Sequence, residues 1–203
     1  MTRISYHHGN LGAALLEAGE RLLAEEGAAG LSLRSVAKAA GVSHTAPYRH
    51  FADKQGLLAA LAKIGFGRLR DGMAAVIDRY PEDPRRQLVE AAVVYVRLAT
   101  ANPEMHHLMF GGVLPVDAAD EAQRQTAREA FEGLVRIVEN GRRAGLYVDR
   151  PPLELAATAW SLVHGLAMLV STGQLERTGP AKAKPETLAR RMAEHLVDGI
   201  AAD

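Results

Sequence analysis

The sequence contains no cysteine, and this absence excludes a disulfide framework, a thiolate metal site and a cysteine nucleophile. Aromatic residues make up only 5% of the 203 residues. β-Branched runs are scarce beside alanine, leucine, glutamate and arginine, which favours helices over strands. No stretch contains the roughly 18 apolar residues of a membrane-spanning helix. The first residues lack the apolar segment of a signal peptide, so we expect a cytoplasmic protein.

The sequence also lacks an excess of charge of either sign. Its formal net charge is zero, because 24 lysine and arginine residues balance 24 aspartate and glutamate residues. Composition alone is therefore a weak basis for predicting a nucleic-acid partner. The balance is uneven along the chain, however. Residues 27–55 carry four basic side chains and two histidines but a single acid, Asp53.

Apolar residues recur at helical spacing along most of the chain, between polar caps, glycines and prolines. Candidate N-caps of the first four helices are Asn10, Ser32, Ser43 and Asp53, and the third of these helices is very short. Five further helices are expected over residues 88–101, 104–110, 120–143, 153–171 and 185–200, with a polar linker at 173–184. Since no alternating strand pattern competes, we predict an all-α fold of about nine helices. A domain boundary is expected between residues 1–52, a three-helix domain, and residues 53–203, a helical bundle.

The most informative stretch is Leu31–Phe51, with the sequence LSLRSVAKAAGVSHTAPYRHF. A helix-turn-helix needs a small residue where its helices cross, a glycine in the turn, and apolar residues on both sides. Ala37 and Gly41 meet the first two requirements, and Val36 and Val42 meet the third. The pattern thus predicts a helix-turn-helix near the N-terminus.

The second helix of such a motif lies in the major groove, with its N-terminal residues at base edges. Small or hydrogen-bonding side chains can approach bases there, and these would be His44, Thr45 and Ala46. Polar tips just beyond them suit phosphate oxygens, and these belong to Tyr48, His50 and Lys54.

The pattern resembles the TetR family of bacterial transcriptional regulators. The matching elements are residues 32–43 (SLRSVAKAAGVS), Tyr48, His50–Phe51, Lys54 and Leu57. Trp160 with His164–Gly165 resembles the Trp-His-Gly type of C-terminal domain found in part of that family, and residues 102–110 fit its short sixth helix. Residues 6–11 are similar to the start of the same subgroup.

The resemblance implies a homodimer that binds a palindromic operator and releases it when a small molecule enters the C-terminal helices. By position, it implies DNA contacts from Ser43, His44, Thr45, Tyr48, His50 and Lys54, and backbone or flanking contacts from Ser32 and Arg34. Pro47 departs from the family pattern. If Ser43 is the N-cap, Pro47 forfeits the first intrahelical hydrogen bond, whereas a later cap would place it harmlessly in the first turn.

Methionine and aromatic side chains in the later helices have two interpretations, a ligand cavity or plain core. The candidates for a ligand site are Phe66, Leu69, Met73, Tyr95, Met105, Met109, Phe110, Trp160, His164 and Met168. For the dimer, the sequence predicts that helices 153–171 and 186–201 pair with their copies. The last helix carries apolar residues at i+4 steps, and small residues suited to close packing are Ala156, Ala157, Ala159 and Gly199.

No catalytic motif or cofactor-binding pattern emerges, so we expect neither an enzyme nor a bound cofactor. The alternative from another class is a small helical metal-binding protein or enzyme that uses His106, His107 and His164. Their spacing is not that of a known zinc motif, and adjacent histidines on a helix point about 100° apart. A helix-bundle interaction module without DNA is the third interpretation.

Overall fold

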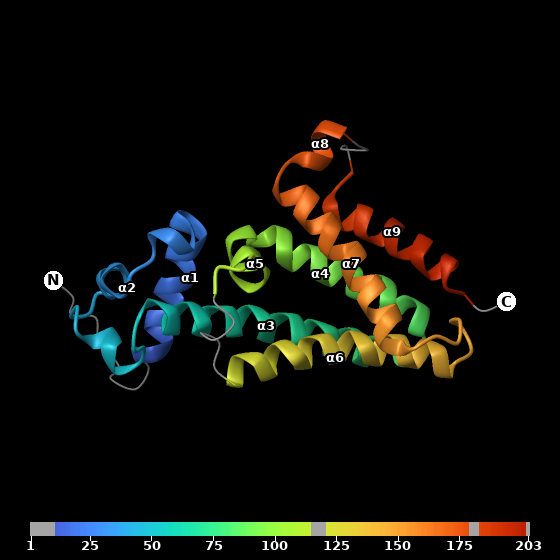
Figure 1. Ribbon diagram of the computed structural model, residues 1–203, viewed down its shortest axis with the longest axis horizontal. Coiled ribbons are helices and arrows are strands. Elements are labelled where there is room, and N and C mark those ends of the chain that lie inside the picture. Colours follow the sequence, from blue (N-terminus) through green and yellow to red (C-terminus); the bar gives the residue numbers. More distant parts are fainter. Residues whose placement is uncertain (1–10, 115–120, 179–182, 202–203) are drawn as a thin grey trace.

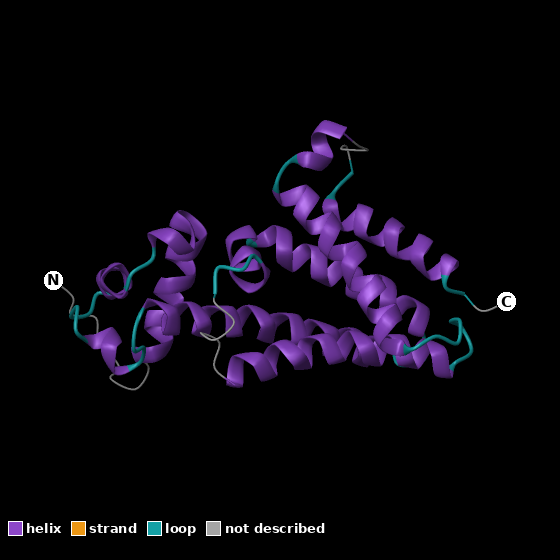
Figure 2. Ribbon diagram, viewed as in Figure 1, coloured by secondary structure: helices purple, strands orange, loops and turns teal. Residues whose placement is uncertain are grey.

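The computed structural model describes residues 11–114, 121–178 and 183–201, and helices dominate these ranges (Figure 2). The described ranges hold nine α-helices and a one-turn 3₁₀ helix, η1 (Ala46–Arg49). The α-helices are α1 (Leu11–Gly30), α2 (Leu33–Ala39), α3 (Lys54–Arg79), α4 (Pro84–Ala101), α5 (Pro103–Phe110), α6 (Glu121–Arg143), α7 (Pro152–Ser171), α8 (Gln174–Thr178) and α9 (Pro185–Gly199). One isolated β-bridge joins Tyr147 to Ala201. The predicted all-α fold is confirmed.

The long helix α3 connects the two ends of the molecule (Figure 1). At its N-terminal end lie α1, α2 and η1, and its other half packs along α6. Farther on, α4 packs against α7 and α9.

Buried apolar residues form two clusters, and α3 contributes to both. Residues 57–66 of α3 pack with α1, α2 and α5, where Leu15 and Val36 are fully buried. Residues 69–76 belong to the second cluster, with α4, α6, α7 and α9. A single continuous helix therefore joins the helix-turn-helix to the bundle.

Short polar side chains begin several helices, as the sequence predicts. Ser32 Oγ accepts a hydrogen bond from the Ser35 amide (3.0 Å), while Ser35 Oγ accepts one from the Ser32 amide (2.9 Å). This reciprocal pair is a capping box at the start of α2. Asp53 caps α3 by accepting from the Gly56 amide (2.9 Å), and Asn102, which was not among the predicted caps, begins α5 in the same way. Each cap satisfies an amide that helix geometry leaves unpaired.

Other segments differ from the prediction. Gly27 after Glu25 and Glu26 is a pattern that predicts the end of the first helix, but the helix is only kinked there, with a φ of +68°, and helical turns continue to Gly30. The expected polar linker contains α8, a short helix. The apolar row on α9 packs against the bundle of its own chain, where Leu188 is buried and Leu196 is half-buried against the same cluster, and its pairing with a second copy stays a prediction. Two further predictions, the Asn10 cap and the helix start at residue 120, lie outside the described residues.

Helix α7 differs from the expectation that no segment is long and apolar enough to span a membrane. An 18-residue window has a mean hydropathy of 1.5, so length and composition alone would let α7 cross a membrane. Core helices of proteins outside membranes pass the same test, and one third of this window is buried in the protomer. The opposite face is exposed and includes Leu153 (62% exposed) and Leu169 (44% exposed). Ala156 and Ala159, expected at a dimer interface, are buried inside the protomer instead.

Candidate nucleic-acid interface and ligand cavity

The turn after α2 is closed by the glycine that the sequence pattern requires. Gly41 adopts a left-handed φ of +69°. The Val42 amide donates to the Ala37 carbonyl (3.0 Å), and the Gly41 amide donates to the Lys38 carbonyl (3.2 Å). These two bonds form a Schellman motif, so α2 ends sharply and the chain continues into η1, which packs against α2.

The second helix of the motif is a single 3₁₀ turn, which corrects the longer helix expected from Ser43. Its N-cap is Thr45, whose hydroxyl lies 3.2 Å from Ser43 Oγ and makes no capping bond. Pro47 is the physical reason, since it has no amide proton and is tolerated only in a first turn. Pro47 is buried, and its carbonyl accepts from the His50 amide (2.9 Å).

Most side chains expected to contact DNA are open to solvent. The exposed ones are Ser32, Arg34, Ser43, His44, Thr45, Tyr48 and His50, and Ala46 and Lys54 are half-buried. Within the part of the chain that the structure describes, Arg34 and Lys54 form no ion pair with an acid. By contrast, Arg190 on α9 binds Glu90 through two hydrogen bonds of 2.9 and 3.1 Å. Cations without an acidic partner are suited to phosphate oxygens.

Two basic side chains fix the helix-turn-helix in place through backbone carbonyls. Lys54 Nζ donates to the Ala29 carbonyl (2.9 Å), which ties the start of α3 to the end of α1. Arg21 donates to the Ala39 carbonyl (3.2 Å) at the C-terminal end of α2. A cation at that end also opposes the negative pole of the helix dipole.

The sequence-based set of contacts left out two exposed basic residues. Arg49 lies on η1 between Tyr48 and His50, and Lys38 lies in the last turn of α2. Neither forms an ion pair with an acid among the described residues. The sequence could have indicated both residues as DNA contacts, because they belong to the excess of basic residues at 27–55.

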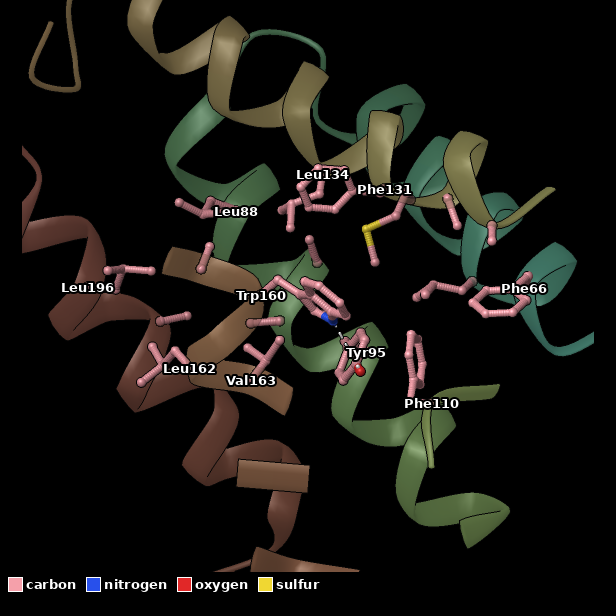
Figure 3. A pocket seen from close by; sticks show the side chains of 18 residues that line it. Phe66, Leu88, Tyr95, Phe110, Phe131, Leu134, Trp160, Leu162, Val163 and Leu196 are labelled. Atoms are coloured by element: carbon pink, nitrogen blue, oxygen red, sulfur yellow. Dashed lines mark hydrogen bonds between the residues drawn. The ribbon is translucent and has the colours of Figure 1, made fainter. Parts of the chain in front are cut away.

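A cavity of about 270 Å³ lies within the bundle (Figure 3). Its 18 lining residues come from α3, α4, α5, α6, α7 and α9, and they are aliphatic or aromatic apart from the thioether of Met73. In Figure 3, Phe66 and Phe110 lie on one side of Trp160 and Leu196 lies on the other. The cavity thus borders the segment where α3 passes from one apolar cluster to the other.

Some of the predicted ligand-site residues line this cavity, and others lie outside it. Those lining the cavity are Phe66, Leu69, Met73, Tyr95, Phe110 and Trp160. Met105 and Met109 line a smaller neighbouring cavity of about 130 Å³, and Met168 lies on the exposed face of α7. Phe131 and Leu134 of α6 also line the larger cavity, although their helical spacing is typical of ordinary core. A ligand-binding role for any of them stays a prediction.

The Tyr95 hydroxyl is the hub of a buried polar network. Trp160 Nε1 donates to it (3.3 Å), and His164 Nδ1 and His106 Nε2 lie 2.8 and 3.1 Å from it. A hydroxyl has one proton and two lone pairs. With one lone pair taken by the indole, it donates to one imidazole and accepts from the other. All its hydrogen-bonding capacity is therefore used when both imidazoles are neutral.

Burial keeps these imidazoles neutral. It lowers the pKa of His106 to about 4, and a proton on neighbouring His164 or His107 would act in the same direction by repulsion. Burial also lowers the pKa of His164, and it raises the pKa of Tyr95. Removal from water disfavours the charged form in each case.

The same geometry bears on the metal-binding alternative. The rings of His106 and His164 lie 5.2 Å apart between centroids, but both present a nitrogen to Tyr95. His107 is exposed on another side of α5. Among the described residues, no three histidine, cysteine, aspartate or glutamate side chains are placed to hold a metal ion.

The fold and these two sites define a helix-turn-helix protein with a separate helical bundle. The sequence model for bacterial regulatory proteins of the tetR family matches residues 15–61. The model for the tetracyclin repressor-like C-terminal domain matches residues 88–196, more than half of the chain. The chain belongs to the TetR family. That family consists of transcriptional regulators and not enzymes, as the sequence predicts. The narrower resemblance to a Trp-His-Gly domain stays a prediction.

Individual relatives give the same picture. The chain is 34% identical over 104 residues to the HTH-type transcriptional regulator Rv1816 of Mycobacterium tuberculosis, a match covering 51% of this chain and 44% of that one. It is 26% identical over 135 residues to the HTH-type transcriptional regulator AcrR of Shigella flexneri, covering 62% and 61%. The chain thus spans less than half the length of its mycobacterial relative.

Solved structures extend the similarity to nearly the whole chain. A protein of unknown function from Rhodococcus sp. RHA1 superposes with a TM-score of 0.85 at 33% identity, over 98% of this chain and 99% of that one. The TetR family regulator PfmR of Thermus thermophilus superposes with a TM-score of 0.70 at 19% identity, over 91% and 97%. The second likeness concerns the fold alone.

Proposed function

We propose that this chain is a cytoplasmic, ligand-responsive transcriptional repressor that binds a palindromic DNA operator as a homodimer and leaves it when a small molecule enters the cavity. The observation that carries the proposal is the exposed turn η1, whose basic neighbours have no acidic partner among the described residues. Residues 1–52 would form the DNA-binding domain, and residues 53–203 would bind the ligand and the partner subunit.

The turn η1, called the reading turn below because it would read the DNA sequence, would contact bases with the residues at its N-terminal side. A 3₁₀ turn is too short to follow the groove far, so the loop before it supplies part of the surface. Base edges would meet Ser43, His44, Thr45 and Ala46, and phosphates would meet Tyr48, Arg49, His50 and Lys54. Ser32 and Arg34 would hold the flanking backbone, because the start of a helix offers amide groups and a positive dipole end to phosphate.

A second copy of the chain would cover the exposed face of α7. A single helix-turn-helix reads too few bases for useful specificity, so two are needed about 34 Å apart on one face of the duplex. Apart from Glu154 and Thr158, the exposed positions of α7 are apolar or small, which suits a self-complementary interface. They include Leu153, Ala157, Ser161, Gly165, Met168 and Leu169.

Helix α5 would carry the ligand signal. Phe110 lines the cavity and His106 bonds the Tyr95 hydroxyl, while Met105 and Leu108 on the same short helix pack with the helix-turn-helix cluster. A ligand that favours one position of α5 and α3 would change the separation of the two reading turns. It would then shift the population of dimers away from the form that fits the operator.

DNA selection followed by matched variants tests this proposal. Duplexes that bind the purified chain are selected from a random-sequence pool, and their affinity is measured by fluorescence anisotropy at several salt concentrations. Arg49→Ala and Lys54→Ala should weaken binding across all selected sequences and flatten the salt dependence by about one phosphate contact each. Thr45→Ala should relax the selected sequence at one position and leave the salt slope unchanged.

The matched control is Arg136→Ala, an exposed arginine in the half of α6 that runs away from the helix-turn-helix. It should bind DNA as the unchanged protein does. The proposed interface is wrong if Arg49→Ala and Lys54→Ala behave like this control, or if no duplex is enriched at low salt.

A further inference from the structure

The cavity wall lacks charge of either sign. Within the described residues, none of its 18 lining side chains is ionisable at neutral pH, and nearly all the lining atoms are carbon. An ion moved from water into such a wall would lose its hydration without gaining a counter-charge. The wall therefore discriminates strongly by ligand charge.

The wall also offers few free hydrogen bonds. Its polar atoms are those of Tyr95 and Trp160, and these bond to each other and to His106 and His164 behind the wall. A ligand hydroxyl or amide could reach the Tyr95 oxygen only by displacing one of its partners, which would leave that partner unpaired in the interior.

The volume limits ligand size. An apolar protein cavity of roughly 150 Å³ holds one benzene ring. At about 270 Å³, this cavity has nearly twice that volume, which is enough for a molecule of about two rings. Phe66, Phe110 and Trp160 provide aromatic surfaces at its sides.

From the uncharged wall, the saturated hydroxyl and the volume, we propose that the effector is an uncharged, mainly hydrocarbon molecule of about two fused rings, and that carboxylates and ammonium compounds of the same shape are excluded. This inference rests on the proposed function, since it names the ligand class of the cavity described there. Affinity then follows the apolar area of the ligand and not its polar groups.

Tetralin and its charged derivatives test the inference directly. Trp160 is the only tryptophan of the chain and lines the cavity, so its fluorescence reports occupancy when it is excited at wavelengths where tetralin is transparent. The full-length protein is titrated with tetralin, the methyl ester of tetralin carboxylic acid, tetralin carboxylate and protonated aminotetralin. We expect saturable binding of tetralin and the ester, and binding about 100-fold weaker or more for the two ions.

Two outcomes overturn the inference: an ion that binds as tightly as tetralin, or neither neutral compound binding up to its solubility limit. The same samples carry a labelled selected duplex, whose anisotropy is read in parallel. If tetralin carboxylate releases the duplex and tetralin does not, the ligand class is wrong but the proposed regulator stands. If no duplex is bound at any stage, the proposed function fails whatever the cavity binds.

A charge placed in the wall provides a second test. Leu134→Arg introduces a guanidinium at a half-buried lining position. It should weaken tetralin binding and strengthen tetralin carboxylate binding about tenfold relative to the unchanged protein. Leu146→Arg, at an exposed leucine outside the cavity, should change neither affinity. Equal effects of the two variants contradict the inference, and circular dichroism establishes that both are folded.

Discussion

Acid should destabilise this protein through His106. Its folded-state pKa is about 4, below its ordinary value of 6.5. Between these values the unfolded chain binds the proton and the folded chain does not, so the stabilising contribution is complete above about pH 6.5 and is lost as the pH falls toward 4. From these two pKa values, linkage lowers the free energy of unfolding by about 2 kcal/mol at about pH 5, and by about 3 kcal/mol at a pH below both values.

Urea unfolding followed by circular dichroism at about pH 7.5 and about pH 5 measures this loss, at a fixed protein concentration. The critical comparison is with His106→Gln, whose amide can bond the Tyr95 hydroxyl but cannot take up a proton. The unchanged protein should lose about 2 kcal/mol more than this variant between the two pH values. The matched control is His107→Gln, at the exposed neighbouring position, which should retain the full loss because His106 is still present.

Burial lowers the pKa of His164 as well, so part of the pH dependence should persist in His106→Gln and disappear in the double variant His106→Gln/His164→Gln. The reasoning is refuted if His106→Gln loses as much stability on acidification as the unchanged protein. It is also refuted if the protein is more stable at the lower pH.

Further predictions concern stability. Gly41→Ala should lower the free energy of unfolding by about 1–2 kcal/mol because of the left-handed φ, and Gly41→Asn by less, as measured by urea titration. Gly141→Ala places a methyl group against the Tyr147 ring and should cost about 2 kcal/mol, whereas Gly67→Ala in the open side of α3 should stabilise by about 0.5–1 kcal/mol. Tyr95→Phe should cost about 2–3 kcal/mol by leaving buried partners unpaired, and an unchanged melting temperature would contradict the network.

Local chemistry made much of the fold predictable from the sequence. Ser32 and Asp53 cap helices because their side chains reach amides within the same turn, and Gly41 ends α2 because its left-handed φ favours glycine. The reading turn was harder to predict. Pro47 indicated a later N-cap, but the sequence pattern does not distinguish a one-turn 3₁₀ helix capped at Thr45 from a short α-helix.

The cavity shows what local patterns leave undetermined. Tyr95, His106 and His164 stand on three helices, so only the packing of α4, α5 and α7 brings them to one hydroxyl. The sequence offered His106 as a candidate metal ligand instead, since nothing near it in the chain indicates Tyr95 as a partner. The apolar row on α9 was ambiguous for the same reason. A helix with one apolar face can pack against its own bundle or a second copy, and within the protomer this face packs against α4.

The central claim is that two chains bind one palindromic duplex together, each through its own turn η1. A gel-shift titration tests this claim most directly when it compares the selected duplex as a full palindrome with an isolated half-site. We expect a complex of two chains with the palindrome, and binding of the half-site weaker by several powers of ten. A chain that remains monomeric and binds the half-site as tightly as the palindrome would contradict the proposed pairing.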